Sequence, residues 1–390
     1  MIGRNLKRLR DDRGLSQEGL AEAAGVSVEV IAKLEQGRRQ TARISTLTKI
    51  ASGLDIDLAT LVDKRDRLGP DRDGGSVLAL RDVLLSPSLL PGLDRDDDGE
   101  PTPVDHLKQV VRNAWNSYWA GDFGELLAVL PGLIGEARVT HSAVGAHAVE
   151  PLALAYEVAS HFATQIGRTD LGLVAAERAV IAAHGGDDPL LWAAMHASYS
   201  WVLLHQGRHG EAEDLAKAMA DRIEPSFRGG EMELAVWGHL LLTAVAPAVA
   251  QERDPSEYLS LAGAAAERLG RRVFLYSKKP FATSAVAMQA TYGYSVLRKP
   301  KRALDAARRI KPGDLDGISR GAHLMDVAQA QLDSGNRRAA ATTLLEAREV
   351  SPVWFRHQRV ARSVTAEIRD RERRLSPETR TLVRALNLDD

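Results

Sequence analysis

The sequence predicts an all-α protein, in which a small N-terminal domain of short helices precedes a longer array of paired helices. Within residues 2–37, three short helical patterns are separated by the serine and glycine signals that begin and end helices. From Val104 onward, helical patterns come in pairs joined by short turns. Similar turns recur at steps of 40 residues (Gly167 to Gly207) and 36 residues (Pro189 to Pro225), which is typical of stacked helical repeats.

The composition sets limits on the class of protein. A chain of 390 residues is long enough for two or three domains, and 44% apolar with 26% charged residues is typical of a globular protein. The formal net charge is −1, so any nucleic-acid site has to be a local basic patch. The chain has no cysteine, which excludes disulfides, thiolate metal sites and cysteine nucleophiles.

The chain shows no signal for export or membrane insertion. The N-terminus lacks the apolar segment of a signal peptide. The most apolar run, residues 234–250, is shorter than the roughly 20 residues of a membrane span and contains His239 and Pro247. We therefore expect a buried helix there and a cytoplasmic protein without a membrane partner.

The first three helices are expected over residues 2–12, 17–24 and 28–36. Ser16 and Ser27 stand at the N-cap positions of the second and third helices. Gly25 lies in the corner between them, where it permits a positive φ without steric cost. The aliphatic residues Leu20, Ile31 and Leu34 are spaced to meet in one core. This pattern predicts a helix-turn-helix, whose second helix is presented to the major groove of DNA.

Residues 2–62 resemble the five-helix DNA-binding domain of the Cro/lambda-repressor (XRE) type. The matching residues are Arg10, Leu15, Gln17, Leu20, Ala21, Gly25, Val26, Ile31, Glu35 and Gly37, followed by Leu47, Ile50, Ala51, Leu54 and Leu58 in helices four and five. The resemblance implies that Gln17 contacts a phosphate and that Arg10 and Glu35 form a buried ion pair. It also implies that Ser27, Val28, Glu29 and Lys33 face base edges.

Charge supports the DNA-binding assignment only locally. Residues 1–62 contain ten basic and eight acidic residues. Arg38, Arg39 and Arg43 follow the third helix, where phosphates would lie, so we predict backbone contacts from them and include Thr41 of the same loop. Glu29 departs from the amide side chains common in the family, and two roles stay open. It either accepts a hydrogen bond from cytosine N4 or caps the helix N-terminus.

Residues 63–103 are predicted to be a linker with a short helix. Residues 63–76 are charged and glycine-rich, as in a flexible hinge, whereas residues 77–90 have an amphipathic pattern. In the acidic segment 94–105, the spacing of Asp94, Asp96, Asp98 and Asp105 matches a calcium loop. Aspartate at the last ligand position and two prolines in the exit half favour a solvated acidic loop instead, and calcium binding stays open.

Six helix pairs are predicted over residues 104–352, with capping helices over 353–390. Their internal turns fall at residues 120–125, 166–170, 206–212, 252–256, 297–303 and 333–339. This pattern resembles degenerate tetratricopeptide (TPR) repeats and predicts an α-solenoid. The complete fold expected is thus a five-helix lambda-repressor-like domain followed by a TPR-like α-solenoid.

The whole chain resembles a group of actinobacterial regulators, through the segments "AWNSYWAGDFGELLAVLPGLIGEA" and "WVLLHQGRHGEAEDLA". This resemblance implies a transcriptional regulator that binds a palindromic DNA operator as a homodimer. The repeat domain would then hold the dimer and sense a peptide or small-molecule effector. Candidate effector-binding residues are aromatic side chains of the repeat domain, namely Trp115, Trp119, Tyr156, Tyr199, Trp237 and Tyr292. Residues 271–281 add two arginines and two lysines, either as an anion site or as a solvated loop.

Two other classes of function are alternatives to an effector-responsive regulator. One is a DNA-binding regulator without a small ligand, whose repeat domain binds a partner protein, as an antitoxin or phage repressor does. The other is an enzyme or scaffold with an N-terminal adaptor domain. The sequence contains no H-E-x-x-H, phosphate loop or nucleophile elbow, so we assign no catalytic residue, cofactor or metal ligand.

Overall fold

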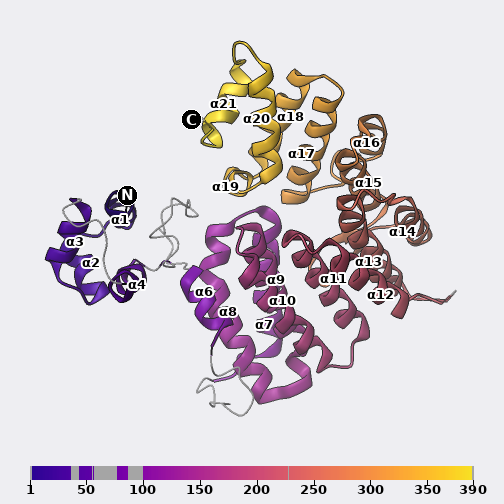
Figure 1. Cartoon of the computed structure of the whole chain (residues 1–390). Coiled ribbons are helices and arrows are strands. Elements are labelled where there is room, and N and C mark those ends of the chain that lie inside the picture. The colour runs from indigo at the N-terminus through magenta and orange to yellow at the C-terminus, as the bar shows by residue number, and fades with distance from the viewer. Residues whose placement is uncertain are drawn as a thin grey trace. The chain divides into compact units, whose positions relative to one another are not determined.

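A computed structural model describes residues 2–36, 44–54, 56, 77–86, 100–226 and 228–388. The chain forms two compact units (Figure 1). The N-terminal unit consists of Met1–Asp96 with Phe123–Gly135, and the second unit, here called the body, consists of Asp97–Asp122 with Glu136–Asp390. Helices dominate both units, and two strands of two residues each are the sheet structure in the described ranges. The predicted all-α class is confirmed.

The N-terminal unit contains the predicted short helices. They are α1 (Ile2–Asp12), α2 (Gln17–Ala24), α3 (Val28–Glu35), α4 (Ile44–Gly53) and α6 (Val77–Leu84). Helix α6 coincides with the short helix expected in the linker. The predicted fifth helix around Leu58, the hinge 63–76 and residues 94–99 of the acidic segment 94–105 lie outside the described residues.

One apolar core holds α1 to α4 together. Its buried members are Leu6, Leu9, Leu20, Ala21, Ala24, Ile31, Leu34, Ile50, Ala51, Leu54 and Ile56. The Ser16 hydroxyl caps α2 as predicted, because its Oγ accepts from the Gly19 N–H at 3.0 Å. The predicted hydroxyl cap by Ser27 is wrong. The Val30 N–H donates instead to the backbone carbonyl of Ser27, so this donor is not left for the hydroxyl.

The remaining helices follow the predicted pairs. They are α7 (Val104–Ala120) with α8 (Phe123–Val144), α9 (Val149–Gln165) with α10 (Thr169–His184), α11 (Pro189–His205) with α12 (His209–Arg222), α13 (Glu231–Ala250) with α14 (Ser256–Leu269), α15 (Thr283–Val296) with α16 (Pro300–Ala307), and α17 (Gly317–Asp333) with α18 (Arg337–Val350). A short 3₁₀ helix, η2 (Gly145–Ala148), precedes α9. Each predicted turn lies between the two helices of a pair.

The turns between paired helices share one backbone conformation. In four pairs a glycine takes the left-handed conformation directly after the first helix or one residue later, at Gly121, Gly167, Gly207 and Gly335. Glu252 and Arg298 adopt the same positive φ in the other two turns. Glycine reaches this region without steric cost, so the regular helix hairpin is encoded locally.

Stacking of the pairs makes the body a solenoid. Each first helix packs on the first helix of the next pair along the series α9, α11, α13, α15 and α17. Each second helix from α10 onward also packs on the following first helix. Such neighbour contacts bury a continuous core, as in TPR-like arrays. The apolar helix α13 is long enough for a membrane span, but 72% of its most apolar window is buried in the body.

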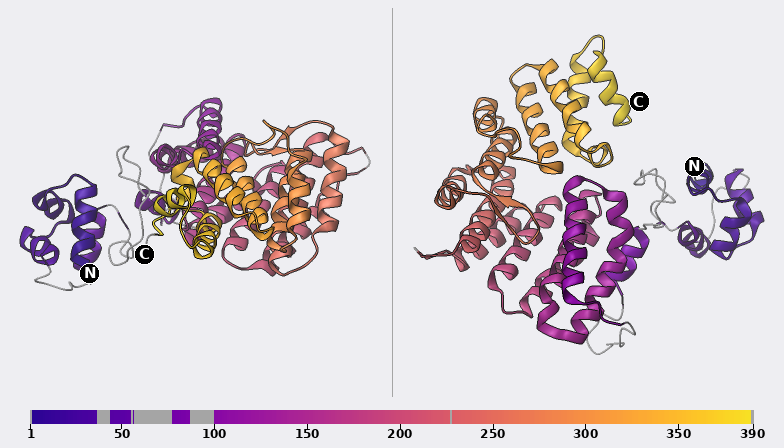
Figure 2. Two further views of the ribbon diagram at one scale, coloured as in Figure 1. Left: turned by 90° about the horizontal axis from the view of Figure 1, so that it is seen from above. Right: turned by 180° about the vertical axis from the view of Figure 1, so that it is seen from behind.

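The body ends in three helices, α19 (Pro352–Arg356), α20 (Arg359–Arg371) and α21 (Pro377–Ala385). A single helix was expected over about 353–369, and the chain instead turns at His357 and Gln358. The short helix α19 buries Trp354 and Phe355. Figure 2 shows these C-terminal helices from two further directions.

Contacts of α7 and α9 with the segment that runs from α17 to α19 add a feature that a simple solenoid lacks. The Ser351 hydroxyl donates to the Gly121 carbonyl at 3.1 Å, and the Trp354 indole donates to Gln165 Oε1 at 3.1 Å. Helix α7 also packs against α17, where Gly317 adjoins the carbonyl of Trp119. We call these contacts the closing contact. Repeats in an open solenoid touch only their neighbours, whereas this body also joins its first helix to its last ones.

Residues 273–281 form a β-hairpin between α14 and α15. Strands β1 (Val273–Phe274) and β2 (Pro280–Phe281) pair antiparallel, with Val273 opposite Phe281. Val273, Leu275 and Phe281 are buried, and a Cβ at Gly238 of α13 would overlap the Phe281 ring. The solvated-loop interpretation of residues 271–281 is therefore wrong, because apolar residues in this segment anchor it in the body.

Candidate functional site

The corner between α2 and α3 has helix-turn-helix geometry. Gly25 ends α2 at φ 60° and ψ 40°, and its N–H donates to the carbonyls of Ala21 and Glu22. Helix α4 approaches α2 so closely that a Cβ at Gly53 would lie 2.8 Å from the Ala24 backbone nitrogen. The absence of a side chain at Gly53 lets α4 approach α2 closely. The sequence pattern indicated the same need for a small residue at Ala21 of α2.

The four predicted base-facing residues are exposed, Ser27 at the N-cap position of α3 and the other three on the helix itself. Ile31 and Leu34 are fully buried and fix the inner face of the helix. Val28 is 38% exposed, although it is apolar, and the remaining predicted residues are exposed as well: Ser27, Glu29 and Lys33. An exposed, mixed polar and apolar helix face is what base readout in a major groove requires.

Glu29 and Lys33 form an ion pair on this face. Lys33 Nζ lies 2.7 Å from Glu29 Oε1 across one helical turn, and both side chains are exposed. The hydrogen bond and charge of Lys33 lower the pKa of Glu29. The carboxylate therefore contacts a neighbouring side chain, and the predicted hydrogen bond from cytosine N4 would require this ion pair to rearrange in the groove.

A buried charge cluster fastens α3 to α1. Arg10 Nε donates to Glu35 Oε1 at 2.7 Å, and a second guanidinium nitrogen donates to Glu35 Oε2 at 3.0 Å. A third donates to the Leu15 carbonyl at 2.7 Å. Burial by itself would raise the pKa of Glu35, but the hydrogen bonds from Arg10 and Gln17 bring it below its ordinary value. The ion pair implied by the family resemblance is present.

Gln17 is part of this cluster. Its side-chain amide donates to Glu35 Oε2 at 2.8 Å. The amide therefore links α2 to the Arg10–Glu35 pair, and its contact with a phosphate stays a prediction. Arg38, Arg39, Thr41 and Arg43 lie outside the described residues, so their predicted phosphate contacts stay predictions as well.

The predicted effector-binding aromatics do not converge on one site. Trp115 is fully buried, stacks on Trp119 with ring centroids 6.0 Å apart, and borders a cavity of about 140 Å³. Trp119 is half-buried and borders a cavity of about 500 Å³. The other four line neither cavity, and of these Tyr156 is buried whereas Tyr199, Trp237 and Tyr292 are half-buried.

A buried network of polar side chains connects α9 and α11 in the body. Ser198 Oγ donates to Glu157 Oε1 at 2.6 Å, and His161 Nε2 lies 3.0 Å from the same hydroxyl. His161 also stacks on Trp201 with ring centroids 4.7 Å apart. Burial raises the pKa of Glu157 to about 8 and lowers that of His161 to about 3. The charge of Lys279, from the hairpin, acts on both groups while burial lowers its own pKa to about 8.

The buried contacts of Glu157 predict that the stability of the body depends on pH. The pKa of Glu157 is raised from 4.5 to about 8 in the folded state, so the stability it contributes is complete below about pH 4.5 and is lost progressively as the pH rises from there through about 8. Glu157→Gln removes the ionisation and is expected to stabilise the body by at least about 1 kcal/mol at pH 9, with little effect at pH 5. Urea denaturation at the two pH values measures the difference.

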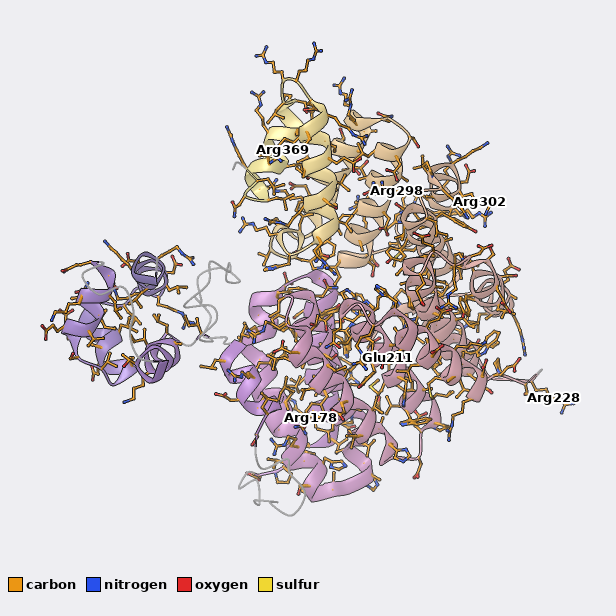
Figure 3. All side chains as sticks on the ribbon, viewed as in Figure 1. Arg178, Glu211, Arg228, Arg298, Arg302 and Arg369 are labelled. Carbon is orange, nitrogen blue, oxygen red and sulfur yellow. The ribbon has the colours of Figure 1, made fainter. Side chains whose placement is uncertain are left out.

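The matched control is Glu211→Gln on α12, labelled in Figure 3. Glu211 is exposed and paired with Arg208, whose hydrogen bond lowers its pKa. Its substitution should give no stabilisation that grows with pH. Equal destabilisation of Glu157→Gln at pH 5 and pH 9 would contradict the assigned ionisation.

Sequence reasoning missed the polar residues inside the body. Glu157, His161 and His239 interrupt otherwise apolar helices, and this interruption was the available signal. It did not show that they meet, because they come from different helix pairs and Lys279 reaches them from the hairpin. The sequence also did not show that Arg112 and residues of the hairpin line one cavity, because they are far apart along the chain.

Known proteins resemble the N-terminal residues most clearly. Residues 6–61 match the helix-turn-helix family HTH_3. The uncharacterised HTH-type transcriptional regulator y4dJ of Sinorhizobium fredii is 36% identical over 66 residues, which are 17% of this chain and 84% of y4dJ. The HTH-type transcriptional regulator SinR of Bacillus licheniformis is 33% identical over 66 residues, 17% of this chain and 60% of SinR. The chain thus spans about 60% of the length of SinR.

Solved structures resemble the chain only distantly. BtubC from P. vanneervenii has a TM-score of 0.38 at 12% identity, covering 64% of this chain and 91% of its own. PlcR of Bacillus thuringiensis, solved with the peptide PapR7 and DNA, has a TM-score of 0.30 at 14% identity, covering 69% and 95%. These scores carry no structural argument. The 36% identity to y4dJ covers 84% of that protein. Together with the family match over residues 6–61, it shows that this chain belongs to the helix-turn-helix, XRE-type family of transcriptional regulators.

Proposed function

We propose that this protein binds DNA sequence-specifically and regulates transcription from the cytoplasm, as a homodimer on a palindromic operator. The observation that carries the proposal is the accessible face of α3, with Val28, Glu29 and Lys33 on the outside while Ile31 and Leu34 anchor the inside. The Arg10–Glu35 pair and Gly25 hold this helix at a fixed angle to its neighbours.

Dimerisation follows from the size of the reading surface. One recognition helix covers too few base pairs for high specificity, so such domains bind two half-sites about 34 Å apart or a multiple of it. Among the described side chains of residues 2–56, Val28 is the exposed large apolar one, and it lies on the DNA-facing side. We therefore assign the dimer contact to parts of the chain beyond α1–α4, with the body as the favoured element.

We further propose that the body transmits an effector signal. Cavities of about 140 and 500 Å³ border α7 and the hairpin, and small-molecule sites typically occupy clefts of about 300–1,000 Å³. An effector acts only through unequal affinity for two states, and a coupling of about 1–3 kcal/mol would change operator affinity roughly 5–150-fold. The closing contact restricts gradual changes of curvature, so an effector would favour the closed or an opened body.

Selection of binding sites from a random DNA library tests the proposal. The full-length protein is expected to enrich a two-fold symmetric sequence. Glu29→Ala is expected to change the preferred base at one symmetric pair of positions, because it removes an acceptor and releases Lys33 from its ion pair. Each lost base contact should cost about 1–3 kcal/mol.

The contrasting variants are Arg38→Ala and Arg39→Ala. If these arginines contact phosphates, both variants weaken all sequences alike and reduce the salt dependence of binding. Enrichment of an asymmetric single half-site would contradict the dimer. A Glu29→Ala variant with unchanged base preferences would contradict the reading role of this face.

A further inference from the structure

The cavity of about 500 Å³ lies between α7, the β-hairpin and the start of α17. Its lining residues come from all three elements and include Arg112, Trp119, Arg272, Phe274, Lys278 and Asp316. We propose that this cavity binds a small anionic amphipathic molecule, an aromatic or short aliphatic group that carries one carboxylate or phosphate. The proposed regulatory meaning of this ligand rests on the proposed function, whereas its binding does not.

The charge of the lining is the first observation. Arg112, Arg272 and Lys278 supply three cations, and Asp316 is the acidic residue of the lining. None of the three cations forms an ion pair with another described residue. The guanidinium of Arg112 donates to the neutral Gln109 Oε1 at 2.6 Å. Positive charge thus remains available for an anion, and arginine forks match carboxylate and phosphate oxygens well.

Arg272 is held in place without being neutralised. Its guanidinium donates to the backbone carbonyls of Gly313 and Asp314, each at 3.2 Å. Neutral acceptors orient the side chain but do not cancel its charge, so one cation of the cavity is positioned before a ligand arrives. Such preorganisation lowers the entropy lost on binding.

The apolar part of the cavity is the second observation. Phe274 is 53% exposed, which is unusual for a phenylalanine in a strand whose neighbours are buried. Trp119 is fixed by a hydrogen bond from its indole N–H to the Ser277 carbonyl at 2.7 Å. Pro280 and the buried Leu315 complete the apolar wall. Two aromatic rings beside three cations suit a ligand that has both an apolar group and an anionic group.

The backbone of Lys278 is the third observation. Lys278 has a φ of 60°, and its N–H donates to the Leu275 carbonyl at 2.9 Å in the tight hairpin turn. Glycine or asparagine is the usual residue at a left-handed position of this kind, because other side chains are strained there. A lysine held in this conformation lines the cavity at a cost in stability, as is common at ligand sites.

The test uses the full-length protein and two matched fluorescent probes. Anilinonaphthalene sulfonate carries an anion on an aromatic scaffold, and phenylnaphthylamine carries the same aromatic scaffold without the charge. The wild-type protein is expected to bind the sulfonate at least tenfold more tightly. Lys278→Gly combined with Arg112→Gln should reduce sulfonate affinity about tenfold or more, since charge-assisted contacts are lost. Arg228→Gln is the control, because Arg228 points away from the body (Figure 3).

Lys278→Gly also separates binding from folding. Glycine removes the strain at a φ of 60°, so the melting temperature of this variant should be unchanged or higher while sulfonate affinity falls. Displacement of the probe by phenylacetate identifies a carboxylate ligand, and displacement by phenyl phosphate identifies a phosphate ligand. Equal affinity for the two probes, or unchanged sulfonate binding in the double variant, would overturn the proposal.

A separate arm measures operator binding in the same samples. If the cavity binds the sulfonate but operator affinity does not change, the site stands and its regulatory role falls. If the protein binds no specific operator, the proposed function falls, whereas the probe measurements still decide the site. The two failures are therefore distinguishable.

Discussion

Glu35→Ala is expected to destabilise the helix-turn-helix by about 3–5 kcal/mol, because the buried Arg10 guanidinium loses its two-oxygen carboxylate partner and keeps the exposed Asp11 as its ion pair. Arg10 is 8% exposed, so water does not replace the lost carboxylate. The variant also deprives the Gln17 amide of its acceptor. Because stabilities of domains are themselves about 5–15 kcal/mol, we expect operator binding to be lost through local unfolding.

Hydrogen exchange measured on the full-length variant reads this effect locally. Amides of α1, α2 and α3 should exchange much faster than in the wild-type protein, whereas those of the body should not change. Glu18→Ala is the control, since Glu18 is exposed and its loss should cost less than about 1 kcal/mol. Unchanged protection of α3 in Glu35→Ala would show that the ion pair does not hold the helix in place.

Gly317→Ala is expected to destabilise the body by about 2–5 kcal/mol, from backbone strain together with overpacking. Gly317 has a φ of 50°, and a Cβ there would overlap the carbonyl oxygen of Trp119 at the end of α7. The variant must therefore move α17 away from α7 and loosen the closing contact. Urea denaturation measures the loss of stability.

Gly313→Ala provides a matched control. Gly313 has a φ of 85°, but no atom lies within 4 Å of the position that a Cβ would take. This variant carries the backbone strain alone, about 1–2 kcal/mol. If both variants lose the same stability, the approach of α7 to α17 contributes nothing measurable to the body.

Much of the fold was predictable because its signals are local. Ser16 and Gly25 mark the ends of α2, and glycines such as Gly121 and Gly207 take the left-handed conformation that ends the first helix of a pair. Helical periodicity located the six pairs for the same reason, since the buried face of a helix repeats every few residues. The Glu29–Lys33 pair was also predictable from its spacing of four residues.

The family pattern in the sequence predicts a DNA-reading face on α3. Val28, Glu29 and Lys33 are exposed on α3, and their contacts with base edges stay predictions. The sequence placed Gln17 toward DNA, whereas in the structure its amide also serves Glu35, eighteen residues away. A contact between separate helices has no periodic signature, so only the packing of α1, α2 and α3 defined it.

By itself, the sequence determined the helix class, the helix-turn-helix corner and the repeated hairpins, because caps, glycine turns and apolar periodicity act within a few residues. Only the tertiary structure decided that α7 meets α17, that α19 is hydrogen-bonded to α9, and that the segment 271–281 contains a hairpin anchored by buried apolar residues. It also decided that Arg112, Arg272 and Lys278 share one cavity. These features depend on how successive helix pairs rotate in the stack, and small rotations add up over the pairs to bring distant residues together.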